Sequence, residues 1–132
     1  MKIDVQRDKP KPGFCTLTPH GPIDSDTYME FQNGIQPLLN PTIKAVLLDL
    51  RDVEYISSAG LGVIFTTKKT LLSRGGDLIF CNLKPQIKKL FEIVKALPVE
   101  SIFASEKEAD AYFYKIMNEE IQKQKGGGEE EG

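Results

Sequence analysis

Alternation of apolar and polar residues near the start of the chain predicts two short strands. Between Lys2 and Gln6, Ile3 and Val5 alternate with polar residues, which is typical of a strand with one buried face. Phe14 to Thr18 has the composition of a second strand, and the prolines and glycine between the two segments are typical of a turn. We therefore expect the two strands to pair as a hairpin.

A helical pattern follows the segment of proline and glycine around His20. Its apolar residues are spaced so that they share one side of a helix. They are Tyr28, Phe31, Ile35, Leu38 and Leu39. Asp24 or Ser25 is the expected N-cap, because a side-chain oxygen there can accept a hydrogen bond from a free amide. Pro37 should kink or end this helix, because proline has no amide hydrogen to donate.

Two aliphatic runs in the middle of the chain predict buried strands. Ala45 to Leu50 shows no alternation, so we expect both of its faces to be covered. Leu78 to Asn82 is the second such strand. The helix predicted between them ends at Gly75-Gly76. Its apolar face contains Leu61, Ile64, Phe65, Leu71 and Leu72.

Two further helices are predicted toward the end of the chain. Pro85 suits the first turn of one, and Ser105 begins a capping-box sequence before the other. Their apolar faces contain Ile87, Leu90, Phe91 and Val94 in the first, and Ala109, Tyr112, Phe113, Ile116 and Met117 in the second. A short strand is expected near Ser101 to Phe103. We expect one domain over residues 1–118 and a disordered tail over 119–132, because the chain from Gln122 onward is charged and glycine-rich.

The predicted order, β-β-α-β-α-β-α-β-α, indicates an open α/β sheet with helices packed on it. The composition agrees with a single soluble domain of this kind. The 132 residues include 17 basic and 19 acidic ones without a basic stripe, so we expect no nucleic-acid partner. No apolar run is long enough to span a membrane and the N-terminus lacks the apolar core of a signal peptide, so we expect no membrane partner and a cytoplasmic protein. Cys15 and Cys81 lie in apolar stretches and are expected to be reduced core thiols.

The chain contains little that indicates catalytic chemistry. Gly60-Leu61-Gly62 begins like a dinucleotide-binding motif, but Phe65 occupies the position of the third glycine. The single histidine, His20, has no cysteine or acidic cluster beside it in the sequence, and we expect it to lie in a solvent-exposed turn. We expect no metal, no cofactor and no catalytic residue.

The most informative segment is the junction between the central strand and the next helix, residues 52–63. In open parallel sheets, ligands and partners bind at loops of this kind. Ser57 and Ser58 lie just before the helix, where a hydroxyl can serve as an N-cap or as a functional group, and the pattern leaves both roles open. The small residues Ala59, Gly60 and Gly62 would allow a partner backbone to approach closely.

This junction resembles the signature of the STAS domain, a family named for sulfate transporters and anti-sigma factor antagonists. The resemblance is carried by the run Val46 to Leu50 followed by Tyr55 to Val63, and it extends from about Lys2 to Asn118. Further matching pieces are Gly21-Pro22-Ile23-Asp24, the Gly-Gly-Asp-Leu sequence that enters the next strand, and Pro85 with Lys88, Lys89, Leu90 and Phe91. The resemblance implies a STAS-type open mixed β-sheet with about four helices.

The resemblance also implies a switch that is not an enzyme. In the family, an anti-sigma factor that is a histidine-kinase-like ATPase phosphorylates a serine at the start of the central helix. The phosphorylated antagonist no longer sequesters that kinase, and a serine phosphatase restores it. Alignment on Gly60 makes Ser58 the acceptor and places Ser57 where the family commonly has aspartate, so Ser57 is a second possible acceptor. The implied partner-binding residues are Asp24, Ser57, Ser58, Ala59, Gly60, Leu61 and Gly62.

Three alternatives remain open on the sequence. STAS modules also serve transport systems, so a stand-alone accessory subunit of a transporter is one. A second is a constitutive STAS scaffold protein, because family members with altered loops bind partners without a phosphorylation switch. A third is a small phosphotransfer enzyme, which would require a nucleotide-binding loop or a catalytic acid-base pair that the chain does not show.

Overall fold

The computed structural model describes residues 1–9, 11–96 and 106–131, and its centre is a mixed sheet of four strands in the order β1-β2-β3-β4. The strands are β1 (Lys2–Arg7), β2 (Phe14–His20), β3 (Ala45–Asp49) and β4 (Asp77–Cys81). β1 and β2 pair antiparallel as the predicted hairpin, while β3 is parallel to both of its neighbours. The expected strand near Ser101 to Phe103 lies outside the described residues.

The helices confirm the predicted α/β class. They are α1 (Tyr28–Ile35), the 3-10 turn η1 (Gln36–Leu38), α2 (Ser58–Ser73), α3 (Pro85–Ala96) and α5 (Glu106–Glu131). Pro37 ends α1 as predicted, because the chain continues as the 3-10 turn that contains it. The predicted N-cap is wrong: Thr27 occupies that position, and neither Asp24 nor Ser25 does.

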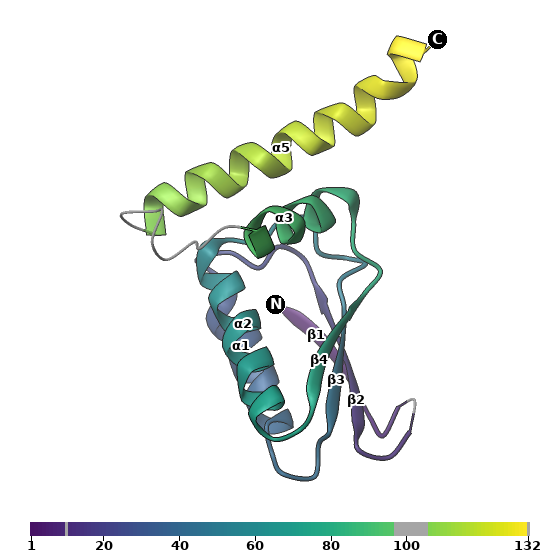
Figure 1. Ribbon diagram of the computed structural model, residues 1–132, viewed down its shortest axis with the longest axis vertical. Coiled ribbons are helices and arrows are strands. Elements are labelled where there is room, and N and C mark those ends of the chain that lie inside the picture. Colours follow the sequence, from purple (N-terminus) through teal and green to yellow (C-terminus); the bar gives the residue numbers. More distant parts are fainter. Residues whose placement is uncertain (10, 97–105, 132) are drawn as a thin grey trace.

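The main core lies between the sheet and the pair α1 and α2, which cover the same face of it (Figure 1). Leu48 of β3 is fully buried on that face, but Leu47 is only half-buried. In the described part of the chain no helix covers the opposite face, where Leu47 is paired with Thr16 and with the exposed Ile79. The expectation that both faces of this strand are covered is therefore wrong for Leu47, although Ala45 and Asp49 on the same side are buried. Sequence alternation is hidden here because Ala45 and Leu47 are apolar although they face the open side.

A second apolar layer joins α3 to α5, which lies across α3 at one end of the molecule (Figure 1). The buried side chains of this layer are Ile87, Leu90, Val94, Phe113 and Met117. α5 continues to Glu131 and so passes through residues 119–131, where the sequence predicts disorder. The side chains of residues 122–125 are exposed, and this stretch of Gln and Lys favours helix without adding to the core.

The remaining expectations concern the two cysteines and the absence of a membrane-spanning helix. Cys15 and Cys81 are both free thiols; Cys15 is buried as predicted, whereas Cys81 is only half-buried on the open side of the sheet. Among the described residues, no helix combines the length and the apolar composition needed to cross a membrane.

Candidate functional site

The loop between β3 and α2 is braced by the segment that follows β2. The amide of Gly21 donates to the carbonyl of Asp52 at 3.0 Å, and the amide of Ile23 donates to the carbonyl of Tyr55 at 2.9 Å. The amide of Ser57 in turn donates to the carbonyl of Ile23 at 2.8 Å. These backbone bonds hold two segments that are distant in the sequence side by side, and they fix where α2 begins.

Ser57 is the N-cap of α2. Its backbone is extended, with φ −84° and ψ 172°, and its Oγ accepts a hydrogen bond from the amide of Gly60 at 3.2 Å. The residue is only 2% exposed. Of the two roles that the sequence leaves open for this pair of hydroxyls, the structure assigns the cap to Ser57.

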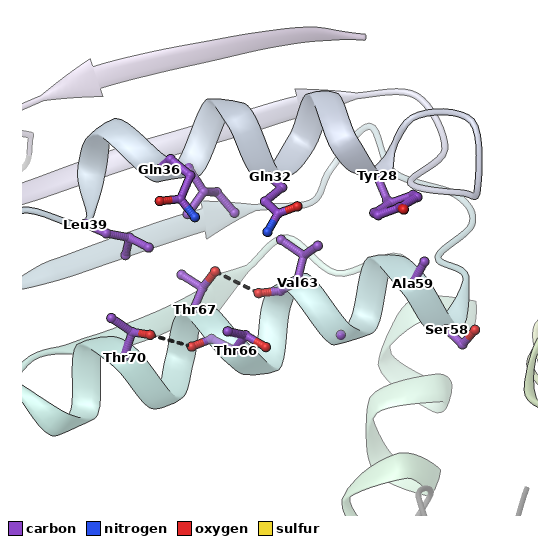
Figure 2. A pocket seen from close by; sticks show the side chains of 12 residues that line it. Tyr28, Gln32, Gln36, Leu39, Ser58, Ala59, Val63, Thr66, Thr67 and Thr70 are labelled. Carbon is purple, nitrogen blue, oxygen red and sulfur yellow. Dashed lines mark hydrogen bonds between the residues drawn. The ribbon is translucent and has the colours of Figure 1, made fainter. Parts of the chain in front are cut away.

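Ser58 is the first residue of α2 and is half-buried. Its side chain lies at the end of the helix and points away from α1 (Figure 2). The Oγ has less than 1 Å² of exposed area, so the side chain must rotate before a kinase could reach the hydroxyl. The position itself is suited to a phosphoryl group, because the amides of a first helical turn and the helix dipole favour a negative charge.

Asp24 has a structural role beside this helix start. Its Oδ1 accepts hydrogen bonds from the amides of Asp26 at 2.9 Å and Thr27 at 3.1 Å. The carboxylate thus closes the turn one residue after Ile23, the residue whose carbonyl binds Ser57. This use of its oxygen explains why Asp24 precedes α1 without being its N-cap.

The two glycines of α2 have different surroundings. A Cβ on Gly60 would lie 2.7 Å from Ile23 Cγ2 and 2.9 Å from the Ile23 carbonyl oxygen, so Gly60 allows α2 to approach the bracing segment. A Cβ on Gly62 would meet no atom within 4 Å. Glycine inside a helix costs about 1 kcal/mol relative to alanine. The close approach at Gly60 accounts for that cost, and nothing in the packing accounts for it at Gly62.

The residues predicted to bind a partner therefore differ in accessibility. Ser57, Gly60 and Leu61 are buried. Asp24, Ser58 and Ala59 are half-buried, and Gly62 is exposed. The structure brings all of them to one region around the start of α2.

A groove between α1 and α2 begins at this helix start (Figure 2). It has a volume of about 330 Å³, and no charged side chain lines it. Its walls are Tyr28, Gln32, Ile35, Gln36 and Leu39 on the side of α1 and η1, and Ser58, Ala59, Gly62, Val63, Thr66, Thr67 and Thr70 on α2. Of these lining residues, the sequence predicts only Ser58, Ala59 and Gly62 as part of the site, and it does not predict the α1 wall. The α1 wall could have been suspected from the uncharged Gln32 and Gln36, which lie one turn apart beside the apolar stripe of the helix.

His20 is not the solvent-exposed turn residue that the sequence suggests. It is the last residue of β2 and is half-buried, with Nε2 2.7 Å from Asp4 Oδ2 and Nδ1 2.7 Å from Asp52 Oδ2. The hydrogen bond to Asp4 and then that to Asp52 raise the pKa of His20 above its ordinary value of 6.5, against the opposing effect of desolvation. Because Asp52 lies in the loop between β3 and α2, the histidine joins the hairpin to that loop.

Other contacts fix the remaining sides of the loop. Tyr55 packs edge-on against Tyr114 of α5, with ring centroids 5.9 Å apart. Asp49 at the end of β3 is bound by the Arg51 side chain and amide, and these hydrogen bonds outweigh desolvation and hold the pKa of the Asp49 carboxyl below its usual range. In the described ranges no cluster of His, Cys, Asp or Glu is suited to a metal ion.

Comparison with known proteins gives relatives that are named as anti-sigma factor antagonists. The chain is 40% identical over 101 residues to BtrV of Bordetella bronchiseptica, which is named as an anti-sigma factor antagonist; the match covers 76% of this chain and 87% of the relative. It is 29% identical over 80 residues to the anti-sigma-B factor antagonist of Staphylococcus aureus, covering 61% and 74% of the two chains.

Solved structures agree on the fold. An anti-sigma factor antagonist from Thermotoga maritima superposes with a TM-score of 0.61 at 21% identity, covering 76% of this chain and 81% of the other. SpoIIAA of Bacillus in its phosphorylated form superposes with a TM-score of 0.58 at 14% identity, covering 70% and 82%. A profile of the STAS domain matches residues 7–109. With this match, the mixed sheet and the helix start at Ser58, the chain belongs to the STAS domain family.

Proposed function

We propose that this protein is an anti-sigma factor antagonist that acts in the cytoplasm as a protein-binding switch and catalyses no reaction itself. In this proposal it sequesters an anti-sigma factor of the histidine-kinase-like ATPase type and so frees a sigma factor. The relatives from Bordetella and Staphylococcus, both named as anti-sigma factor antagonists, support the general role. The geometry at the start of α2 supports the proposal that the switch operates there.

The single observation that carries the switch is the division of roles between two adjacent serines. Ser57 is a buried N-cap whose hydroxyl is engaged with the Gly60 amide. Ser58 is half-buried at the first helical position, where a phosphoryl group would lie beside the helix N-terminus. Ser58 is therefore the phosphoacceptor in this proposal.

The departure from the family at Ser57 has a simple physical account. Asp and Ser are comparably good N-caps, so a serine at the family's aspartate position keeps the start of α2 in place. It also removes a negative charge from the neighbourhood of the acceptor, which lessens the repulsion that a phosphoryl group would meet there. The substitution is thus compatible with phosphorylation of Ser58.

Phosphorylation would act on the complex and leave the fold in place. A phosphoryl group adds about −1.5 to −2 charges at pH 7. The partner, which docks around Ser58, Ala59 and Gly62, would have to desolvate that charge or neutralise it. Buried neighbours such as Gly60 and Leu61 would shape this surface from beneath, and a serine phosphatase would restore the binding form.

The proposal is tested by binding of the purified cognate kinase-type anti-sigma factor to three proteins. Wild type and Ser58→Ala should bind equally well, whereas Ser58→Asp should bind at least tenfold more weakly, a loss of about 1.4 kcal/mol. Circular dichroism of Ser58→Asp should match that of wild type. Equal binding by all three proteins would contradict the switch and favour a constitutive scaffold, and absence of binding by wild type would contradict the proposed partner.

A further inference from the structure

Two glycines one half-turn apart on α2 differ in what the fold requires of them. Gly60 is pressed against Ile23, so a side chain there is excluded by packing. Gly62 is exposed, and a Cβ there would enter open space. Glycine is among the poorest helix formers, so a glycine inside a helix without a packing reason suggests a functional one.

The bare surface at Gly62 is part of the wall of the α1/α2 groove. Gly62 lies one turn beyond Ser58, and both residues line the groove. The exposed face of α2 beside this wall carries two large apolar side chains, Phe65 at 42% and Leu72 at 52% exposure. Ser58, Phe65 and Leu72 are spaced by seven residues, which aligns them along the helix.

The chemistry of the groove defines what can occupy it. None of its lining side chains is charged, although charged residues make up 27% of the chain. Two of its hydroxyls bind carbonyls of α2 itself: Thr67 Oγ1 donates to the Val63 carbonyl at 2.7 Å and Thr70 Oγ1 to the Thr66 carbonyl at 2.9 Å. An apolar group placed over them would therefore leave neither hydroxyl without a partner.

A charged group is a poor occupant by the same reasoning. It would lose water on entering the groove and would find no opposite charge there. The α2 wall extends from Ser58 to Thr70, a rise of about 18 Å along the helix. This length accommodates several successive side chains of a partner.

We propose that Gly62 opens the α1/α2 groove to a ridge of uncharged side chains on the anti-sigma factor. The groove is then a second part of the docking surface, continuous with the helix start at Ser58, and the exposed Phe65 and Leu72 extend it along α2. This inference rests on the proposed function. The groove adds to the proposed function the place where most of the contact area forms. Its lining adds the chemistry of the partner surface that fits there.

Filling the groove at Gly62 separates binding from folding. Gly62→Ala should raise the melting temperature by about 3–5 °C because alanine favours helix. Gly62→Leu should remain folded and bind the purified cognate anti-sigma factor at least tenfold more weakly, because its side chain occupies the groove. Asn33→Leu adds leucine to an exposed position of α1 that does not line the groove, and it should bind like wild type. Gly60→Ala should lower the melting temperature, which confirms the contrast between the two glycines.

Charge at the far end of the groove gives a second, independent test. Thr70→Val keeps the shape and should bind within twofold of wild type, whereas Thr70→Glu and Thr70→Lys should each bind at least tenfold more weakly. Equally weak binding by the Glu and Lys variants would indicate that the cost is desolvation of a charge. Weaker binding by only one of the two variants would contradict an uncharged occupant.

The failure of this inference is distinguishable from failure of the proposed function. Wild-type affinity in Gly62→Leu, with weak binding by Ser58→Asp, would overturn the groove and leave the switch standing. Absence of binding by wild type would overturn both.

Discussion

The Gly60 amide donates a hydrogen bond to Ser57 Oγ at 3.2 Å, and this bond marks the first turn of α2. Because Ser57 is also held by the Ile23 carbonyl, the cap links the helix start to the segment that follows β2. The neighbouring hydroxyl of Ser58 is thereby left at the first helical position. The two serines have the same side chain, but Ser57 precedes the helix as its N-cap and Ser58 is its first residue, so their roles differ.

Removal of the cap should destabilise the fold measurably. Ser57→Ala should lower the free energy of unfolding by about 1 kcal/mol, because the Gly60 amide loses its acceptor. Ser57→Asp should remain within about 0.5 kcal/mol of wild type, since aspartate caps equally well. Urea denaturation monitored by circular dichroism measures both. A Ser57→Ala protein as stable as wild type would show that the cap contributes nothing.

The ion pairs of His20 predict a pH dependence of stability. Their hydrogen bonds raise the pKa of His20 in the folded state above the ordinary value of 6.5, so the protonated histidine stabilises the fold. This contribution is fully present below about pH 6.5 and is lost as the pH rises through the higher pKa of the folded state. His20→Gln should therefore be less stable than wild type at pH 5.5, and the difference should shrink at pH 8.5.

Urea midpoints of both proteins across this range provide the measurement, with Asp52→Asn as a control that removes one of the two carboxylates. A difference that grows as the pH rises would contradict the assignment. High salt should reduce the difference at pH 5.5, because the two carboxylates are about half exposed and salt screens them.

The end of α5 should be dispensable for stability. Deletion of residues 122–132 removes exposed side chains at 122–125 and keeps Tyr114, which contacts Tyr55, and the buried Phe113 and Met117. We expect the melting temperature to change by less than about 4 °C, which corresponds to roughly 1 kcal/mol for a domain of this size. A larger fall would show that the last part of α5 contributes to the folded domain.

The fold could be predicted from sequence wherever local pattern decides structure. The hairpin, the aliphatic strand β3 and the apolar stripes of α1 and α3 follow from periodicity. The predicted stripe of α2 is right for Leu61, Ile64 and Leu71 but wrong for Phe65 and Leu72, which are exposed. The open face of β3 could not be predicted, because the aliphatic Leu47 faces that side although no described helix covers it. The helical backbone after residue 118 was also missed, because low apolar content indicates lack of core contacts and does not by itself exclude helix.

The start of the central helix was predicted from the sequence, but the separate positions of its two serines were not. Pattern alone could not decide between Ser57 and Ser58, because the phase of α2 depends on the Ile23 carbonyl, which is distant in sequence. The partners of His20 lie 16 and 32 residues away for the same reason. The groove required the packing of α1 against α2, which no local pattern describes.

The central claim is that phosphate on Ser58 controls binding, and one measurement tests it directly. Wild type, Ser57→Ala and Ser58→Ala should be incubated with the cognate anti-sigma kinase and ATP, mapped by mass spectrometry, and then assayed for binding. We expect label on Ser58 in wild type and Ser57→Ala, none in Ser58→Ala, and at least tenfold weaker binding by the labelled proteins. Label on Ser57 alone, or full binding by protein labelled on Ser58, would contradict the account.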